Sequence, residues 1–224
     1  MSNIFIGFCD AFKVSRRIPL RRRIKAPRFS FSAFALVLER LRTVQKRILA
    51  GSTAGHVAKD VRTSWPKYFY QAENLGYTMN VFNRVQKLDT KQRGRKSPVD
   101  PFSDSTADST GDDGIAPAYD VRTGEQGVDE NLHLNMMDSM WDCKAQPGTI
   151  VLATGDAAEA EFSPGFFQYA IRALDAGWML ELVTWKRAIS SAWKTPEFTK
   201  KYAGKFRIIY LDDFLEELQM VDLF

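Results

Sequence analysis

Short apolar runs alternate along the chain with stretches whose apolar residues recur every three or four positions. The run from Ile150 to Ala153, bounded by Pro147-Gly148 and by Gly155, is typical of a strand buried on both faces of a parallel sheet. The alternation predicts an α/β fold in which helices sandwich one parallel sheet. The expected strands are 46–51, 77–82, 150–153, 178–184 and 206–211, and the expected helices are 32–41, 65–75, 127–141, 166–176, 196–202 and 212–218.

Other parts of the chain have a weaker pattern. Residues 4–8 fit either a short strand or the first turns of a helix capped by Ser2 or Asn3. The helix over 32–41 is expected to begin with Ser32 as its N-cap. Residues 86–126 are polar and of low complexity, which predicts a long disordered insertion without secondary structure. We therefore expect a single domain over residues 1–224 that carries this insertion.

The charge of the chain is unevenly distributed. The net charge is +4, and before residue 48 lysines and arginines far outnumber the two acids, Asp10 and Glu39. The segment 13–31 interleaves basic and aromatic residues around the run Arg21, Arg22 and Arg23, which suits phosphates and stacked bases. A nuclear-localisation run or a solvated loop explains this composition equally. Another basic pair, Lys186 and Arg187, follows the strand 178–184 beside two tryptophans that serve either as stacking platforms or as core.

Several classes of protein are disfavoured. No run approaches the ~20 apolar residues that span a bilayer, and no secretory signal is recognisable, so we expect an intracellular protein, cytoplasmic or nuclear, without a membrane partner. Cys9 and Cys143, with only two histidines, support neither a disulfide framework nor a zinc site. No Gly-x-Gly-x-x-Gly follows a strand, which disfavours a nucleotide-cofactor fold. The pattern leaves the oligomeric state open.

Acidic residues mark one edge of the predicted sheet. Asp156 lies at the carboxyl end of the strand 150–153, after Thr154 and Gly155, and ligands of open α/β sheets bind outside the carboxyl ends of the strands. Asp129 and Glu130 lie in the first turn of the helix 127–141. Each position has a structural alternative. Asp156 caps the helix that begins near Ser163 or closes a turn. Asp129 and Glu130 are acids in a first turn, where the helix dipole stabilises negative charge. We expect His133 to face solvent, the alternative being a partner of Asp129 one turn away.

Three motifs in order carry a family resemblance. They are Val128-Asp129-Glu130, the segment from Thr149 to Asp156 with Glu161-Phe162 after it, and Gly177-Trp178 leading a strand into Thr184-Trp185-Lys186-Arg187. Together they resemble the NYN domains of the PIN-like nuclease superfamily, fungal members in particular. The resemblance covers about residues 2–85 and 127–220, and it implies a PIN-like, Rossmann-like parallel sheet.

The resemblance also implies a chemistry. It assigns Asp129, Asp156 and Glu161 as ligands of Mg²⁺ or Mn²⁺ and Asn3 as a residue that orients the site. Glu159 competes with Glu161, because Ala157 to Ala160 lengthen the usual spacing. Carboxylates hold such a hard cation, which activates water and offsets phosphate charge. The implied activity is endoribonuclease cleavage of single-stranded RNA, with phosphate contacts from Arg21, Arg22, Arg23, Lys186 and Arg187. The alternative is an RNA-binding module without catalysis.

One departure from the family pattern concerns the first strand. Ser2-Asn3 matches the end of the family's Asp-x-Ser-Asn turn, so the first aspartate and the strand before it are missing from this sequence. Asp10 lies about two helical turns beyond and does not easily replace that aspartate. The sequence is then either shortened by a misplaced start or a degenerate copy. Residues 4–8 would belong to a helix, and we expect either instability or a gap in the sheet.

Overall fold

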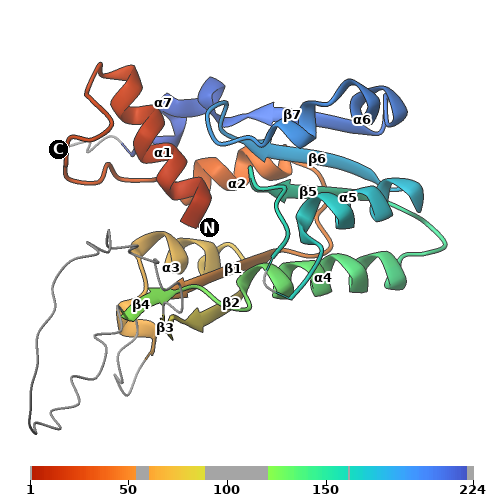
Figure 1. The fold of residues 1–224 in the computed structure, drawn as a ribbon, viewed down its shortest axis with the longest axis horizontal. Coiled ribbons are helices and arrows are strands. Elements are labelled where there is room, and N and C mark those ends of the chain that lie inside the picture. Colours follow the sequence, from red (N-terminus) through yellow and green to blue (C-terminus); the bar gives the residue numbers. More distant parts are fainter. Residues whose placement is uncertain (1, 54–60, 89–120, 161, 221–224) are drawn as a thin grey trace, which may run out of the picture.

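The computed structural model describes residues 2–53, 61–88, 121–160 and 162–220 (Figure 1). It is an α/β structure, as predicted. The helices are α1 (Ser2–Ser15), α2 (Phe31–Glu39), α3 (Lys67–Asn74), α4 (Val128–Asp142), α5 (Gly165–Asp175), α6 (Pro196–Lys201) and α7 (Leu215–Leu218), and short 3₁₀ turns cover Val61–Ser64, Ser191–Lys194 and Leu211–Phe214. The strands are β1 (Ile48–Thr53), β2 (Thr78–Asn83), β3 (Val85–Leu88), β4 (Val121–Gly124), β5 (Thr149–Ala153), β6 (Met179–Thr184) and β7 (Phe206–Tyr210).

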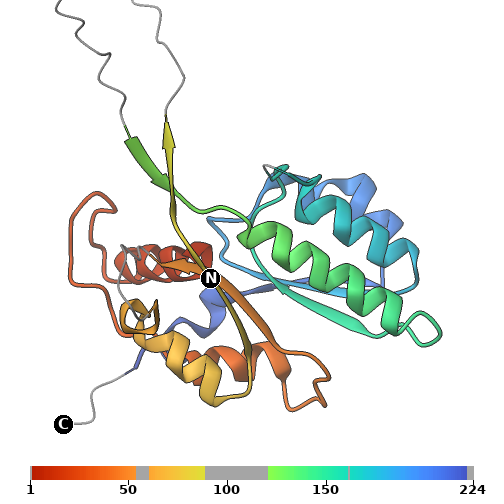
Figure 2. The ribbon, with the colours of Figure 1, turned by 90° about the horizontal axis from the view of Figure 1, so that it is seen from below.

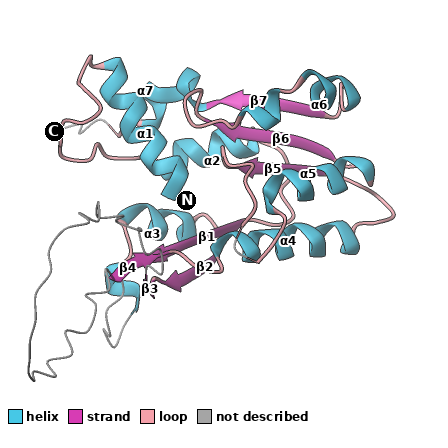
Figure 3. Ribbon diagram, viewed as in Figure 1, coloured by secondary structure: helices cyan, strands magenta, loops and turns pink. Residues whose placement is uncertain are grey.

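The parallel strands form two small sheets. One contains β1 and β2, and the other has the order β5-β6-β7. All five strands point in the same direction, so their carboxyl ends share one side of the molecule (Figure 3). The prediction of one continuous sheet is therefore wrong, and the expected gap lies between β1 and β5. Strand β5 is also less buried than predicted, since only Leu152 of its five residues is fully buried.

Helices cover both faces of the two sheets. Helices α1, α2 and α3 lie on one side, and α4 and α5 lie on the other (Figure 2). Helix α4 packs against β1 and β2 as well as against α5, so it spans the gap. A core around Phe31, Phe34 and Leu49 also takes in Val151 of β5, which joins the two sheets through side chains. A second core fills the space between β5-β6-β7 and helices α5 and α6.

Residues 4–8 belong to helix α1, the arrangement that the family resemblance implied. Ile4 and Phe8 are buried, and the indole Nε1 of Trp185 donates a hydrogen bond of 2.9 Å to the carbonyl oxygen of Ile4. A Cβ on Gly7 would lie 2.1 Å from Trp185 Cδ1, so only glycine lets the helix approach this indole. Trp185 therefore fixes α1 at the carboxyl end of β6.

Helix α2 begins earlier than predicted, and its cap is Ser30 instead of Ser32. Ser30 has extended backbone angles, and its Oγ accepts a hydrogen bond of 3.2 Å from the Ala33 amide. Phe31 is buried at the first helical position. Because Ser32 lies inside the helix, its own amide and hydroxyl cannot serve as the cap.

The predicted disordered insertion is ordered at its two ends. Val85–Leu88 pairs with Val121–Gly124 in an antiparallel ribbon, with Val85 opposite Gly124. This pairing contradicts the prediction that 86–126 lacks secondary structure. The pairing joins segments more than thirty positions apart, which local composition does not reveal. Residues 89–120 lie outside the described residues.

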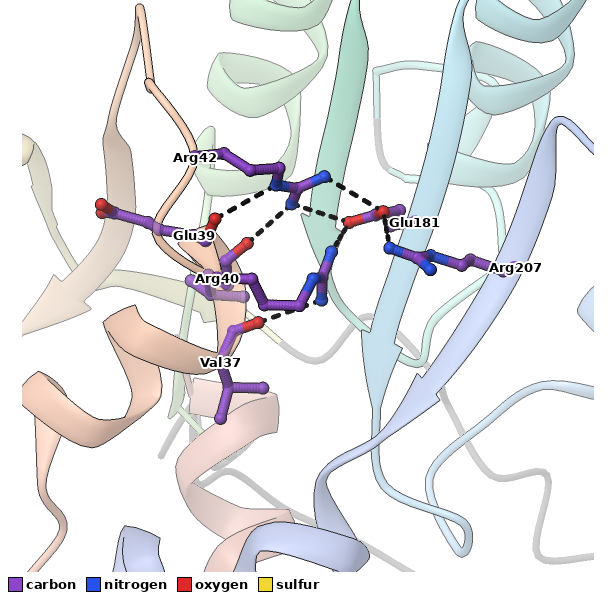
Figure 4. Close-up of polar contacts among 7 residues, drawn as sticks. Val37, Glu39, Arg40, Arg42, Glu181 and Arg207 are labelled. Atoms are coloured by element: carbon purple, nitrogen blue, oxygen red, sulfur yellow. Dashed lines mark hydrogen bonds and ion pairs between the residues drawn. The ribbon is translucent and has the colours of Figure 1, made fainter.

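A buried carboxylate ties the turn after α2 to the larger sheet (Figure 4). Glu181, in the middle of β6, is buried and accepts hydrogen bonds from Arg40, Arg42 and Arg207. Arg42 binds it in a bidentate manner, with distances of 3.1 Å from Nη1 and 2.9 Å from Nη2. Arg40 and Leu41 both have positive φ angles, of 46° and 59°, a conformation that is costly for these residues. The ion pairs with Glu181 offset that cost and hold the turn.

We expect Glu181→Gln to destabilise the protein strongly. Three arginines would lose a buried carboxylate that accepts their hydrogen bonds, but their own side chains are 31%, 37% and 60% exposed, so the loss should be about 1.5–3 kcal/mol. Urea unfolding followed by tryptophan fluorescence measures the loss. Arg207→Ala is the matched control, because the Arg207 side chain is 60% exposed and its removal should cost no more than ~1 kcal/mol. Equal, small losses in both variants would contradict a structural role for the buried carboxylate.

Candidate functional site

A cavity of about 510 Å³ lies at the carboxyl ends of the larger sheet. Its walls come from α1, the segment after β5, the segment after β6 and the turn after β7. It brings together three residues that the sequence analysis selected, namely Asn3, Asp156 and Arg187. Two carboxylates that were not selected, Asp10 and Asp212, also line it. The cavity is thus lined by three carboxylates and one arginine.

The segment after β5 holds Asp156 through its backbone. A Cβ on Gly155 would lie 2.2 Å from the Ala188 carbonyl oxygen, so glycine is needed where the two segments meet. The Gly155 carbonyl accepts a hydrogen bond of 2.9 Å from the Ser190 amide, and the Asp156 carbonyl accepts one of 3.2 Å from Trp193 Nε1. These contacts fix the position of the aspartate without using its carboxylate.

The carboxylate of Asp156 has a partial structural role. Its Oδ1 accepts a hydrogen bond of 2.8 Å from the Ala158 amide and closes a turn, as one of the structural alternatives predicted. It does not cap α5, which begins at Gly165 without a side-chain cap. The described residues place no hydrogen bond on Oδ2, so this oxygen is available to a ligand at the cavity.

Asp129 interacts electrostatically with Asp156 across the same edge. It lies in the first turn of α4, and partial burial together with the charges of Asp156 and Glu130 raises its pKa. Neighbouring carboxylates of this kind repel each other, and a cation or a proton relieves the repulsion. Glu130 has a separate role, since its Oε1 accepts a hydrogen bond of 3.1 Å from the Phe162 amide and ties the loop before α5 to α4.

The prediction that His133 faces solvent is wrong. His133 is only 1% exposed, its ring stacks on Tyr169 at 4.4 Å, and its Nδ1 lies 2.7 Å from Ser163 Oγ. Burial lowers the pKa of the imidazole, which favours the neutral ring. His133 faces α5 because α4 packs against that helix, a contact that the spacing of apolar residues within α4 does not reveal. It anchors the loop that carries Asp156.

The basic residues differ in how available they are. Arg187 lines the cavity, whereas Lys186 is bound locally: its Nζ is 2.7 Å from Asp213 Oδ1 and 5.5 Å from the centre of the Tyr210 ring. Arg21, Arg22 and Arg23 are exposed in the segment between α1 and α2, and Leu20 of that segment lines the cavity. The basic run thus begins beside the site.

Two tryptophans belong to the core and do not form a stacking surface. Trp185 is 1% exposed and Trp193 is fully buried. This is the alternative in which the indoles are core. RNA bases cannot stack on either ring in this structure.

The positions of Asp10 and Asp212 were detectable in part. Asp212 lies two residues after the end of β7, and Asp156 lies three residues after the end of β5, so the same argument about strand ends applies to both. Asp10 shares a face of α1 with Asn3 and Gly7, because these residues are spaced by one and two helical turns. This spacing predicts that Asp10 lies on the side of Asn3 only once residues 4–8 are known to be helical. Glu159 is exposed, and Glu161 lies outside the described residues.

The oxygen donors at this edge suit a hard divalent cation. The described residues contain no cluster of three or more His, Cys, Asp or Glu side chains that would enclose a metal. Asp129 and Asp156 form a smaller set, and Asn3 lines the same cavity as Asp156. Mg²⁺ keeps several waters and is commonly bound through one or two carboxylates, so this set fits Mg²⁺ or Mn²⁺.

Comparisons with protein-family models, curated proteins and solved structures found no match to this chain. Among the described residues, no helix has the length and apolar character needed to cross a membrane. The functional argument therefore depends on the site itself.

We expect Asp129→Asn to stabilise the protein at neutral pH, by up to about 1 kcal/mol, because it removes a partly buried charge and its repulsion by Asp156 and Glu130, which water partly screens. The pKa of Asp129 is raised in the folded state, so the wild-type protein recovers stability relative to the variant as pH falls through that pKa towards 3.8. Thermal unfolding between pH 4 and pH 8 measures the difference. Asp138→Asn, an exposed site on the same helix, is the control and should change little. A destabilised Asp129→Asn would refute the repulsion.

Proposed function

We propose that this chain is a PIN-like domain that cleaves single-stranded RNA with the help of Mg²⁺ or Mn²⁺. The observation that carries the proposal is the cavity at the strand ends, which is lined by Asn3, Asp156 and Arg187. Asp129, on α4, interacts electrostatically with Asp156. A metal bound there would supply a Lewis acid and an activated water. Glu161 completes the proposed ligand set.

The residues of the chain divide the remaining work. Arg187 offers a bidentate fork to a phosphate inside the cavity, and Arg21, Arg22 and Arg23 extend the positive surface outside it. Asn3 lies on α1, which packs against Trp185. Its side-chain amide orients the substrate or a metal-bound water. Lys186 contributes charge at longer range, because Asp213 already binds its ammonium group. This arrangement favours a negatively charged chain whose backbone, and not its bases, is recognised.

One observation favours the second candidate function, an RNA-binding module without catalysis. The described residues show the two coupled carboxylates Asp129 and Asp156, and no cluster of three acids. A pair of carboxylates binds a hard cation more weakly than a larger set. The same basic residues would then bind RNA without cleaving it.

Replacement of Asp156 separates the two functions. In the hydrolytic case, we expect Asp156→Asn to reduce cleavage of a fluorescent single-stranded RNA in Mn²⁺ at least ~100-fold, because a direct ligand matters no less than the groups that orient ligands. RNA affinity measured in EDTA should stay the same, because the phosphate contacts come from arginines. Asp138→Asn is the charge-matched control and should retain full activity.

Two outcomes would decide against hydrolysis. Unchanged turnover in Asp156→Asn would show that any cleavage arises elsewhere. RNA binding that persists in EDTA, with no product from the wild-type protein in Mg²⁺ or Mn²⁺, would assign the binding function instead.

A further inference from the structure

Three arginines gather around a single carboxylate on the side of the larger sheet where α2 lies (Figure 4). Glu181 and Arg207 are direct neighbours in the register of β6 and β7, and the turn after α2 brings Arg40 and Arg42 to the same carboxylate. We call these four residues the arginine cluster. The side chain of Glu181 is only 7% exposed, whereas the three arginines are 31% to 60% exposed. The carboxylate is thus the base of the cluster, and the guanidinium groups form its outer surface.

The charges of the arginine cluster do not balance. One carboxylate matches one guanidinium group, so two of the three positive charges have no counter-charge within the cluster. The adjacent acid, Glu39, is already bound by Arg47 through Nε at 2.7 Å and Nη2 at 2.8 Å. Burial and the charges of Arg42 and Arg207 lower the pKa of Arg40, an effect expected when cations are held together. An anion at the surface of the cluster would relieve this repulsion.

Two of the three arginines retain unused donors. Arg42 is fully engaged, since its three nitrogen atoms donate to Glu181 and to backbone carbonyl oxygens of α2. Within the described part of the chain, the side chain of Arg207 donates only to Glu181, through Nη2. The two Nη atoms of Arg40 donate to Glu181 and to a backbone carbonyl oxygen. The Nε and Nη1 groups of Arg207 and the Nε group of Arg40 therefore remain available to an anion.

The cluster is arranged before any ligand binds. Arg40 and Leu41 have positive φ angles, and strained backbone of this kind occurs often at turns that hold ligands. The hydrogen bonds to Glu181 fix the guanidinium groups, so less side-chain entropy is lost when an anion binds. Guanidinium groups bind phosphate oxygens through two parallel N–H donors. The arrangement thus favours a phosphate group.

The charge surplus distinguishes between two kinds of phosphate. A phosphate monoester carries close to two negative charges at neutral pH, because its second pKa is about 6. A phosphodiester carries only one. The two unmatched positive charges of the arginine cluster therefore favour a monoester over a diester.

The arginine cluster is separate from the cavity that contains Asp156. Glu181 precedes Trp185, which lines that cavity, by four residues along β6. A strand rises about 3.3 Å per residue, so roughly 13 Å separate the two positions along the sheet. A phosphate bound by the cluster would not contact Asp156. The two sites are therefore testable independently.

We propose that Arg40, Arg42 and Arg207, held by Glu181, form a binding site for a phosphate monoester. The ligand accepts hydrogen bonds from Arg207 and Arg40, and Arg42 contributes charge. The monoester is either a free small molecule or the terminal phosphate of an RNA strand, which share this chemistry. This binding is independent of the proposed nuclease function, since it uses neither the acidic cavity nor a metal.

Methyl phosphate, a monoester, and dimethyl phosphate, a diester, test the proposal on the full chain in EDTA. At pH 7.5 we expect saturable binding of methyl phosphate by isothermal titration calorimetry. It should bind at least about fivefold more tightly than dimethyl phosphate, because it carries nearly one more negative charge. The difference should disappear at pH 5, where the monoester also carries about one negative charge. Equal affinities at pH 7.5, or no saturable binding of methyl phosphate, would overturn the proposal.

Variants of the protein locate the binding site. Arg207→Ala removes the most exposed donor and should weaken methyl phosphate binding at least about tenfold, because a hydrogen bond between charged groups is lost. Arg40→Gln should also weaken it. Arg172→Ala is the matched control and should leave binding unchanged, because Arg172 is exposed on α5, on the opposite face of the sheet (Figure 2). Thermal unfolding without ligand shows whether each variant is folded. Unchanged binding in a folded Arg207→Ala would place the phosphate elsewhere and refute the site.

Two RNA strands of one sequence, with a 5′-phosphate or a 5′-hydroxyl group, identify the source of the monoester. Tighter binding of the phosphorylated strand, lost on addition of methyl phosphate, would assign the site to RNA ends. Equal binding of the two strands, with methyl phosphate still bound, would assign it to a free small molecule. All these measurements are made without a divalent cation, so they do not depend on whether the chain cleaves RNA.

Discussion

The two parallel sheets depend on helices that reach across the gap between β1 and β5. No backbone pairing crosses that gap in the described residues, so the connection is made by side chains. Helix α4 packs on the smaller sheet and on α5, and α2 contributes Phe31 and Phe34 to a core that includes Val151. The turn after α2 adds an electrostatic tie, because Arg40 and Arg42 bind Glu181 in β6. The relative placement of the sheets therefore relies on packing and on one buried charge network.

The same constraint explains how the site is assembled. Asn3 reaches the cavity because Trp185 binds α1 through the Ile4 carbonyl, and Asp156 is held by backbone contacts of Gly155. Neither depends on pairing across the gap. The carboxylates themselves have few internal partners, and partial burial together with the charges of Asp156 and Glu130 raises the pKa of Asp129. Electrostatic free energy is thus stored at a place where a cation would release it.

The sequence predicted local features better than contacts between distant segments. The alternating pattern identified the parallel strands and the longer helices, and the rule on strand ends placed Asp156 at the cavity. The wrong predictions share one cause: each depends on contacts with segments that are distant in the sequence. His133 is buried by α5, and the insertion is ordered at its ends by a long-range ribbon. No local pattern at these residues specifies their partners.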